Sequence, residues 1–157
     1  MMSQSGYLPI ERGIGTIRLA AEFLAAARQQ DLEQTPPSMV TYFLLGHALE
    51  LAFKSVLIAH GSTDAALRKL SHDLTASRNA ACEAAPSGPV VLSVDDTDQL
   101  ELLTPFYRAK ALEYVQPGFR RLPIPAKLTE LTERLVGKIS PYVDSRVRAS
   151  LRERRAV

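Results

Sequence analysis

The sequence predicts an all-α protein, a bundle of about five helices with a short extra helix. Leu and Ala dominate the 46% of residues that are hydrophobic, and runs of β-branched or aromatic residues, which strands favour, are scarce. In several segments apolar residues recur every three or four positions, which is the spacing of one helix face. The 157 residues match the usual size of one domain, so we expect a single domain over residues 1–157.

Two long helices are expected in the N-terminal part. The first ends near Gln30 and carries an apolar stripe formed by Ile14, Ile17, Ala20, Leu24 and Ala27. Two prolines then interrupt the pattern, and Ser38 is a suitable N-cap for a second helix from about Met39 to His60. This second helix is apolar nearly all round, so it should lie at the centre of the bundle, and Gly61 is placed to end it.

Two shorter helices should follow this glycine. STDAALRKL reads as a short helix capped by Ser62 or Thr63, and SHDLTASRNAACEAA reads as another that starts between Ser71 and Asp73 and ends before Pro86. The next stretch, PSGPVVLSVDD, has some strand character. It is too short to distinguish a strand from an extended segment, and we expect a loop.

The C-terminal part should hold one more helix and a long last one. The former begins near Asp96 or Thr97, with Pro105 as the expected site of a kink. VQPGFRRLPIP contains three prolines and a glycine, so it should be irregular. From Ala126 an apolar stripe marks the last helix, formed by Leu128, Leu131, Leu135, Ile139, Tyr142 and Val143.

The composition excludes several classes of protein. A net charge of +2 is too small for the whole molecule to attract nucleic acid, so any basic surface must be local. Cys82 is the only cysteine, which rules out an intramolecular disulfide and fits a reducing compartment. The N-terminus lacks the pattern of a secretory signal, and the apolar run from Met39 to Ala59 contains Glu50 and Lys54, which are costly in lipid. We therefore expect a cytoplasmic protein without a membrane span.

The sequence offers three polar residues on the otherwise apolar second helix. His47, Glu50 and Lys54 share one helix face, and Glu50 and Lys54 form an i,i+4 pair. In the structural interpretation Glu50 pairs with Lys54 or another basic group and His47 donates to a backbone carbonyl, because buried charges are paired. In the functional interpretation the three residues share in a ligand-binding or catalytic pocket.

Metal and cofactor sites are not expected. A di-metal bundle needs two Glu-x-x-His copies and two further glutamates, whereas the order in HALE is reversed. The sequence also has no Gly-rich phosphate loop, no Gly-x-Ser-x-Gly elbow and no zinc-ligand spacing. We predict neither a metal ion nor a cofactor.

Arg68 and His72 are the candidate catalytic residues. They lie four positions apart around a helix break, and Asp73 follows at once. A guanidinium that holds a phosphate beside a histidine that moves a proton is the pairing needed to cut RNA through its own 2′-OH. In the alternative interpretation His72 or Asp73 caps the next helix and Arg68 is solvated.

Two basic segments are further candidates for binding. Tyr107, Arg108, Lys110 and Tyr114 interleave aromatic and basic side chains, as do Phe119, Arg120 and Arg121, which suits stacking on a base beside a phosphate but is also ordinary at surfaces. Between positions 146 and 155 five arginines and one glutamate give a net charge of +4. This segment could bind RNA or an acidic partner, but cations are favoured near a helix C-terminus, and we favour a solvated face.

Two runs together resemble a known group of families. YFLLGHALELAFKSVLIAHG is similar to their long apolar helix with a Glu-Leu-x-x-Lys-like segment, here Glu50 to Lys54, and LRKLSHDLTA to their His-Asp-Leu turn, here His72 to Leu74. LTPFYRAKALEY resembles a later helix that ends in a basic residue and a tyrosine. Over residues 38 to 115 the chain therefore resembles the HEPN families, named for higher eukaryotes and prokaryotes nucleotide-binding.

This resemblance implies an up-and-down bundle that forms a homodimer with its site in a cleft at the dimer interface. Many members are ribonuclease toxins or defence proteins, and others bind nucleotides beside a nucleotidyltransferase, so an antitoxin or a nucleotidyltransferase is the implied partner. The nuclease members have four to six residues between an arginine and a histidine, whereas three separate Arg68 from His72.

Three hypotheses for function follow. The first is a non-catalytic or weakly catalytic HEPN-like domain that binds nucleotide or RNA through His72, Asp73 and Lys54, with Lys110 or Arg108 as phosphate contacts. The second is a metal-independent endoribonuclease that uses Arg68 and His72. The third is a protein–protein interaction module.

Overall fold

The fold is a bundle of α-helices, as the sequence predicts. The computed structural model describes residues 9–108 and 121–157, and these residues form six helices and no strand. The helices are α1 (Arg12–Arg28), α2 (Met39–Ala59), α3 (Asp64–Leu70), α4 (Leu74–Ala84), α5 (Val94–Arg108) and α6 (Pro125–Arg155). The segment expected to be a loop before α5 contains no strand, and α5 begins at Val94, slightly before the expected start.

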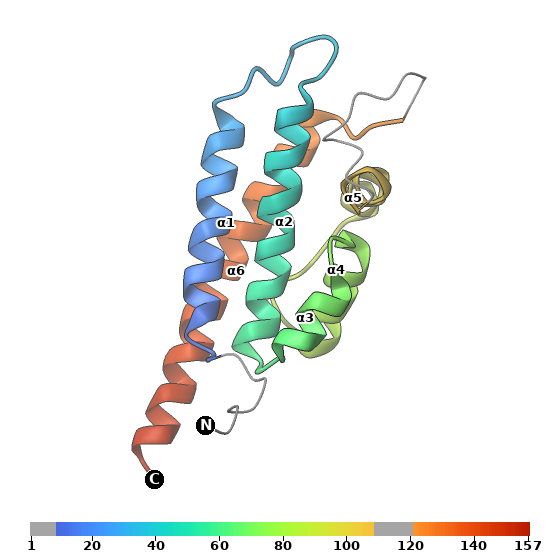
Figure 1. Cartoon of the computed structure of the whole chain (residues 1–157). Helices are drawn as coiled ribbons and strands as arrows, with labels where there is room; N and C mark the ends of the chain where they lie inside the picture. The colour runs from blue at the N-terminus through green and yellow to red at the C-terminus, as the bar shows by residue number, and fades with distance from the viewer. Residues whose placement is uncertain (1–8, 109–120) are drawn as a thin grey trace, which may run out of the picture.

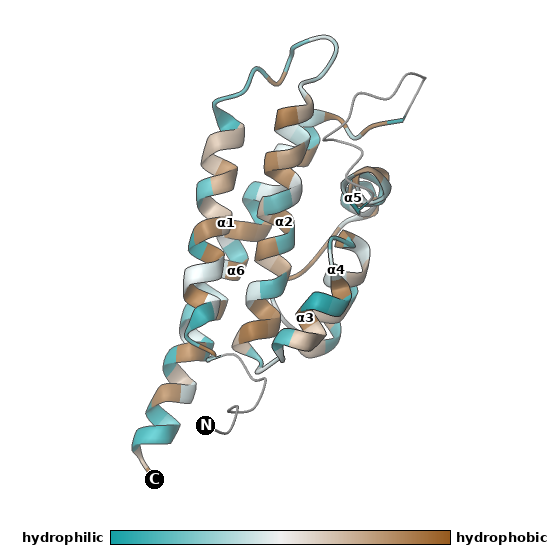
Figure 2. Cartoon of the chain, viewed as in Figure 1, coloured by the Kyte–Doolittle hydropathy of each residue, from teal (hydrophilic) through white to brown (hydrophobic). Residues whose placement is uncertain are grey.

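Helix α2 lies at the centre of the bundle. Figure 1 shows α1 beside it, α6 behind the pair, and α3, α4 and α5 on the other side. Fourteen of its 21 residues are buried, and hydrophobic segments recur along its whole length in Figure 2. Its largest fully buried side chains are Tyr42, Leu45, Leu49 and Phe53, which pack with the apolar stripes of α1 and α6. The near-continuous hydrophobicity of α2 thus reflects contacts on several sides.

Helix α2 is also the one described helix that is long and apolar enough to cross a membrane. Most of its apolar surface is buried against the other helices. Burial of this kind is typical of the core helix of a soluble protein.

Local sequence signals set several helix ends. Gly61 has a φ of 82°, a left-handed conformation that glycine adopts without steric cost, and it ends α2 as expected. The Thr63 side chain caps α3 by accepting a hydrogen bond from the Ala66 amide at 3.1 Å. Ser38 occupies the N-cap position of α2, but its side chain makes no capping hydrogen bond. Helix α5 continues through Pro105.

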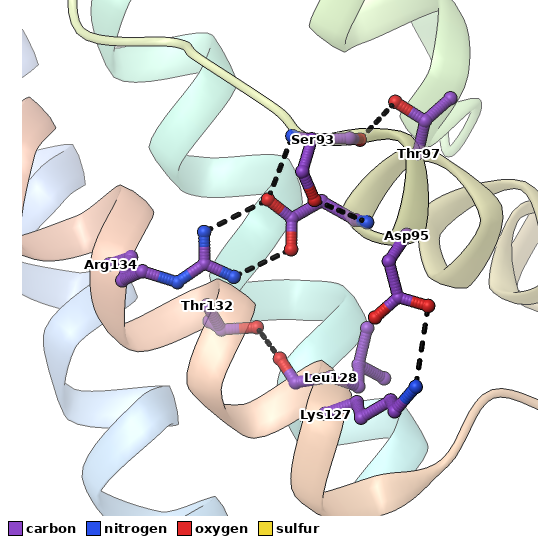
Figure 3. Close-up of polar contacts among 8 residues, drawn as sticks. Ser93, Asp95, Thr97, Lys127, Leu128, Thr132 and Arg134 are labelled. Carbon is purple, nitrogen blue, oxygen red and sulfur yellow. Dashed lines mark hydrogen bonds and ion pairs between the residues drawn. The ribbon is translucent and has the colours of Figure 1, made fainter.

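A capping box ties the start of α5 to α6. The Ser93 hydroxyl accepts from the Asp96 amide at 3.1 Å, while the Asp96 carboxylate accepts from the Ser93 amide at 3.0 Å. The two terminal nitrogens of the Arg134 guanidinium also donate to the Asp96 carboxylate, at distances of 2.9 and 2.5 Å (Figure 3). Nearby, Lys127 pairs with the exposed Asp95 at 3.3 Å. Asp96 therefore both caps α5 and anchors it to α6.

Candidate functional site

A polar network centred on Glu50 interrupts the apolar core. Its carboxylate binds the Lys54 ammonium at 2.6 Å through Oε1, and through Oε2 it binds the Tyr107 hydroxyl at 2.6 Å and His72 Nδ1 at 3.1 Å. These partners come from α2, from α5 and from the turn between α3 and α4. Three elements therefore converge on one carboxylate.

His47 extends this network into the core. Its Nδ1 is within hydrogen-bond distance of the Tyr107 hydroxyl, and its ring packs against Phe23 and Phe43, with centroid distances of 4.8 and 4.9 Å. The structural interpretation gave His47 a backbone carbonyl as its partner, whereas the structure gives it a tyrosine. The pairing of Glu50 with Lys54 is the one that the i,i+4 spacing predicts.

The electrostatics of the network fix the direction of its hydrogen bonds. Burial raises the pKa of Glu50, but the hydrogen bonds from Lys54, Tyr107 and His72, together with the positive charge of Lys54, outweigh burial, so the pKa lies below its usual value. Burial and the adjacent carboxylate raise the pKa of Tyr107, and burial lowers the pKa of His47. Glu50 is therefore an ionised acceptor and Tyr107 a neutral hydroxyl.

The positions of the protons follow from this assignment. Since an ionised carboxylate only accepts, the Tyr107 hydroxyl must donate a hydrogen bond to Glu50, and Nδ1 of His72 must donate another. The Tyr107 oxygen then accepts a hydrogen bond from Nδ1 of His47. When neutral, His72 consequently presents its Nε2 as an acceptor.

The backbone between α3 and α4 places His72 beside Glu50. Ser71 has a φ of 50°, which is uncommon for a residue other than glycine, and its carbonyl accepts a hydrogen bond from Lys54 at 2.7 Å. Asp73 then caps α4 through Oδ1, which accepts from the Ala76 amide at 2.9 Å. Lys54 thus holds both the carboxylate and the turn, while the cap of α4 fixes the chain after His72.

Exposure separates the supporting residues from those that a ligand can reach. The Glu50 and Lys54 side chains are 9% and 15% exposed, whereas that of His72 is 39% exposed. Arg108 is 66% exposed and lies 3.4 Å from Oδ2 of Asp73. A ligand at this surface would meet His72 and Arg108, with Glu50 and Lys54 beneath them.

Arg68 lies apart from this network. Its guanidinium pairs with Asp64 at 2.6 Å on α3, and its side chain is 81% exposed. Among the described residues, no hydrogen bond or ion pair joins Arg68 to His72. These features agree with the interpretation in which Arg68 is solvated and Asp73 caps the next helix. Lys110, the other predicted phosphate contact, lies outside the described residues, as do Tyr114, Phe119 and Arg120.

Sequence reasoning missed two residues that shape the site. A Cβ at Gly46 would lie 2.5 Å from Cδ2 of Tyr107, so the ring can pack on α2 only because this residue is glycine. Ser71 supplies the carbonyl that Lys54 binds. The sequence contained a signal for Gly46, a glycine inside a helical pattern, but no signal for the Ser71 carbonyl.

The described residues contain no group of three His, Cys, Asp or Glu side chains that could hold a metal ion. The side chains of the network offer proton transfer and anion binding. An oriented imidazole can accept or give a proton at Nε2, and a guanidinium can hold an anion.

Comparisons with known proteins add no relative. No protein-family model, curated protein or solved structure matches the chain.

Proposed function

We propose that the chain is a HEPN-like domain that binds a nucleotide or RNA at the surface formed by His72, Asp73 and Arg108. In this proposal His72 and Arg108 contact the phosphate and base, while the network of Glu50, Lys54 and Tyr107 holds His72 in place and Asp73 lies beside Arg108. The domain works as a cytoplasmic homodimer, in line with the family resemblance, and an antitoxin or a nucleotidyltransferase is its expected partner.

The observation that carries the proposal is the convergence of α2, α5 and the turn between α3 and α4 on the Glu50 carboxylate. Such a network is expensive to build in an apolar core, because each polar group must find a partner. Its outer member, His72, remains accessible and is held in one orientation. Because the side chain is already ordered, a ligand that binds it pays a smaller entropic cost.

Arg108 is the basic side chain best placed to assist. Its ion pair with Asp73 is long and its side chain is mostly exposed, so the pair contributes little and can give way to a phosphate. Guanidinium groups bind phosphate oxygens in a bidentate manner. The proposal therefore assigns to Arg108 the phosphate contact that the sequence pattern offered.

The orientation of His72 also favours a second candidate function, a metal-independent ribonuclease. A carboxylate that fixes the histidine tautomer is the arrangement that general acid–base catalysis requires. His72 Nε2 would take the proton of the 2′-OH as its oxygen bonds to the phosphorus, and the bond from phosphorus to the 5′-oxygen would break as that oxygen takes a proton from water, which leaves a 2′,3′-cyclic phosphate. In this candidate Arg108 or Arg68 stabilises the charge on the phosphate oxygens.

Titration of the purified protein with a mononucleotide and with a labelled single-stranded RNA tests the proposal. We expect saturable binding at low salt that weakens about tenfold or more in His72→Ala and in Arg108→Ala, because each removes a hydrogen bond to a charged group worth about 1.5–3 kcal/mol. The matched control is Arg28→Ala, an exposed arginine of α1 that pairs with Glu133. Absence of saturable binding, or equal binding by all variants, would contradict the proposal.

Incubation of the RNA without added metal distinguishes the two candidates. Cleavage that disappears in His72→Ala while Arg28→Ala retains it would support the ribonuclease. Binding without cleavage would leave the non-catalytic domain. Circular dichroism of each variant verifies that the helical bundle is intact.

A further inference from the structure

The end of α6 carries an arginine row that the proposed site does not use. Buried residues of α6 end at Val147, and Figure 1 shows the last turns extending past the ends of α1 and α2. Arg148, Arg152 and Arg155 follow one another at intervals of four and three residues, so they lie on one ridge of the helix. With Leu151 they line a shallow depression of about 270 Å³.

The other two arginines of this segment have structural partners. Arg146 donates to the carbonyl of Ala59, near the end of α2, at 3.2 Å, and Arg154 lies 3.8 Å from Glu11 at the start of α1. Neither residue is on the ridge of the arginine row. These two therefore hold α6 against the bundle, and the row is a separate feature.

The arginine row has little counter-charge of its own. Arg148 pairs with Asp144 at 2.9 Å, and in the described part of the chain Arg152 and Arg155 have no acidic partner. Like charges one turn apart destabilise a helix. The helix dipole favours cations in the last turn, but its effect fades beyond that turn and so does not account for Arg148. A row of three arginines with one acidic partner is suited to binding an external polyanion.

Several features favour nucleic acid over an acidic protein or a membrane. Protein interfaces and membrane-binding helices both rely on apolar anchors, whereas the row offers only the half-buried Leu151. Interfaces with nucleic acid are more polar and much more positive. All five basic residues of the segment are arginines, which suits phosphate because the guanidinium fork binds it in a bidentate manner. The arginines of the row follow one another at about 6 Å and about 4.5 Å along the helix axis, so the row matches a linear chain of charges.

We propose that Arg148, Arg152 and Arg155 form a second binding surface, for the phosphodiester backbone of nucleic acid. This surface is independent of the His72 network: it contacts backbone phosphates without reading bases, and it needs no other site to function. A single nucleotide, which offers no line of phosphates, should gain nothing from it.

The test compares two triple variants that each remove three positive charges. Arg148→Gln/Arg152→Gln/Arg155→Gln removes the row, and Arg28→Gln/Lys127→Gln/Lys138→Gln removes three exposed cations elsewhere. The probe is a labelled single-stranded RNA, titrated across a salt series. A plot of the logarithm of the binding constant against the logarithm of the salt concentration has a negative slope. Each lost phosphate contact should reduce the steepness of this slope by about 0.7, so the row variant should lose about 2 units and the control variant none.

The possible results separate this proposal from the proposed function. Loss of slope in the row variant, with unchanged mononucleotide binding, would support the arginine row even if His72→Ala had no effect on any ligand. Equal slopes in both triple variants would overturn it. So would polyglutamate that binds the unmodified protein as tightly as the RNA, because the row would then accept any polyanion. Circular dichroism verifies that α6 remains helical in both variants.

Discussion

The Oε2 atom of Glu50 lies 3.1 Å from Nδ1 of His72, and the same oxygen accepts a hydrogen bond from Tyr107. A buried carboxylate that only accepts hydrogen bonds thus dictates which nitrogen of an accessible imidazole carries the proton. This relationship joins residues 22 positions apart and connects the core of the bundle to its surface.

Glu50 should hold His72 in a single tautomer. At pH 8, where an imidazole is ordinarily neutral, we expect the proton on Nδ1 and the lone pair on Nε2. In Glu50→Ala this preference should disappear because the acceptor is gone. Nitrogen NMR of labelled histidine distinguishes the two tautomers, and a His72 protonated at Nε2 in the unmodified protein would contradict the assignment.

Removal of the Glu50 charge should destabilise the fold strongly. The Lys54 side chain is only 15% exposed, and Glu50→Gln removes its counter-charge. We therefore expect the free energy of unfolding, measured in urea, to fall by about 3 kcal/mol. The double variant Glu50→Gln/Lys54→Met should lose less, because the second change removes the unpaired charge. The control Asp64→Asn, at an exposed ion pair, should change stability by about 0.5 kcal/mol or less.

The single variant Lys54→Met completes the comparison. If the losses of unfolding free energy in the two single variants add up to the loss in the double variant, the two residues do not interact. That outcome would remove the basis for treating Lys54 as part of the network.

Gly46→Ala should displace Tyr107. Its new Cβ would meet Cδ2 and Cε2 of the ring at 2.5 and 2.7 Å, which forces the ring or the helix to move. We expect a loss of about 1–3 kcal/mol in urea denaturation and weaker binding at His72. Gly137→Ala is the matched control: a Cβ at this helical glycine would meet no atom within 4 Å outside the adjacent backbone of its own helix, and the change should stabilise the fold by about 0.5–1 kcal/mol. Equal effects of the two substitutions would contradict the close packing.

Local signals explain how much of the fold was predictable. Apolar periodicity identified the helices, and the caps at Thr63 and Asp73 and the stop at Gly61 set their ends. The Glu50–Lys54 pair was equally accessible because i,i+4 neighbours meet on any helix. All of these features depend on residues close together in the sequence.

The rest of the site depends on contacts between distant residues. Tyr107 lies 57 positions from Glu50, and nothing in the local pattern indicates which face of α5 meets α2. The same holds for the pair formed by Asp96 and Arg134, which are 38 positions apart. Arg68 forms its ion pair with Asp64, one helical turn before it, and not with a group of the His72 network. Nucleotide or RNA binding and the HEPN resemblance stay predictions.

The stability that the capping box of α5 contributes should depend on pH. The fork of Arg134 and the hydrogen bonds with Ser93 hold the pKa of Asp96 at about 2, below its ordinary value of 3.8. A depressed pKa in the folded state stabilises the protein above the unfolded pKa, and that contribution disappears as the pH falls through the folded pKa.

Stability from Asp96 should therefore be complete above about pH 4 and be lost toward pH 2. We expect Asp96→Asn to cost about 1–2 kcal/mol at pH 7, and the difference from the unmodified protein to narrow as the pH approaches 2. Urea denaturation at several pH values measures the loss of stability at pH 7 and the way the difference changes with pH. Asp95→Asn is the control, because Asp95 is 59% exposed and its ion pair with Lys127 lies on the surface, so its effect should be small at every pH. A gap between Asp96→Asn and the unmodified protein that stayed constant between pH 7 and pH 2 would show that Asp96 acts through packing alone.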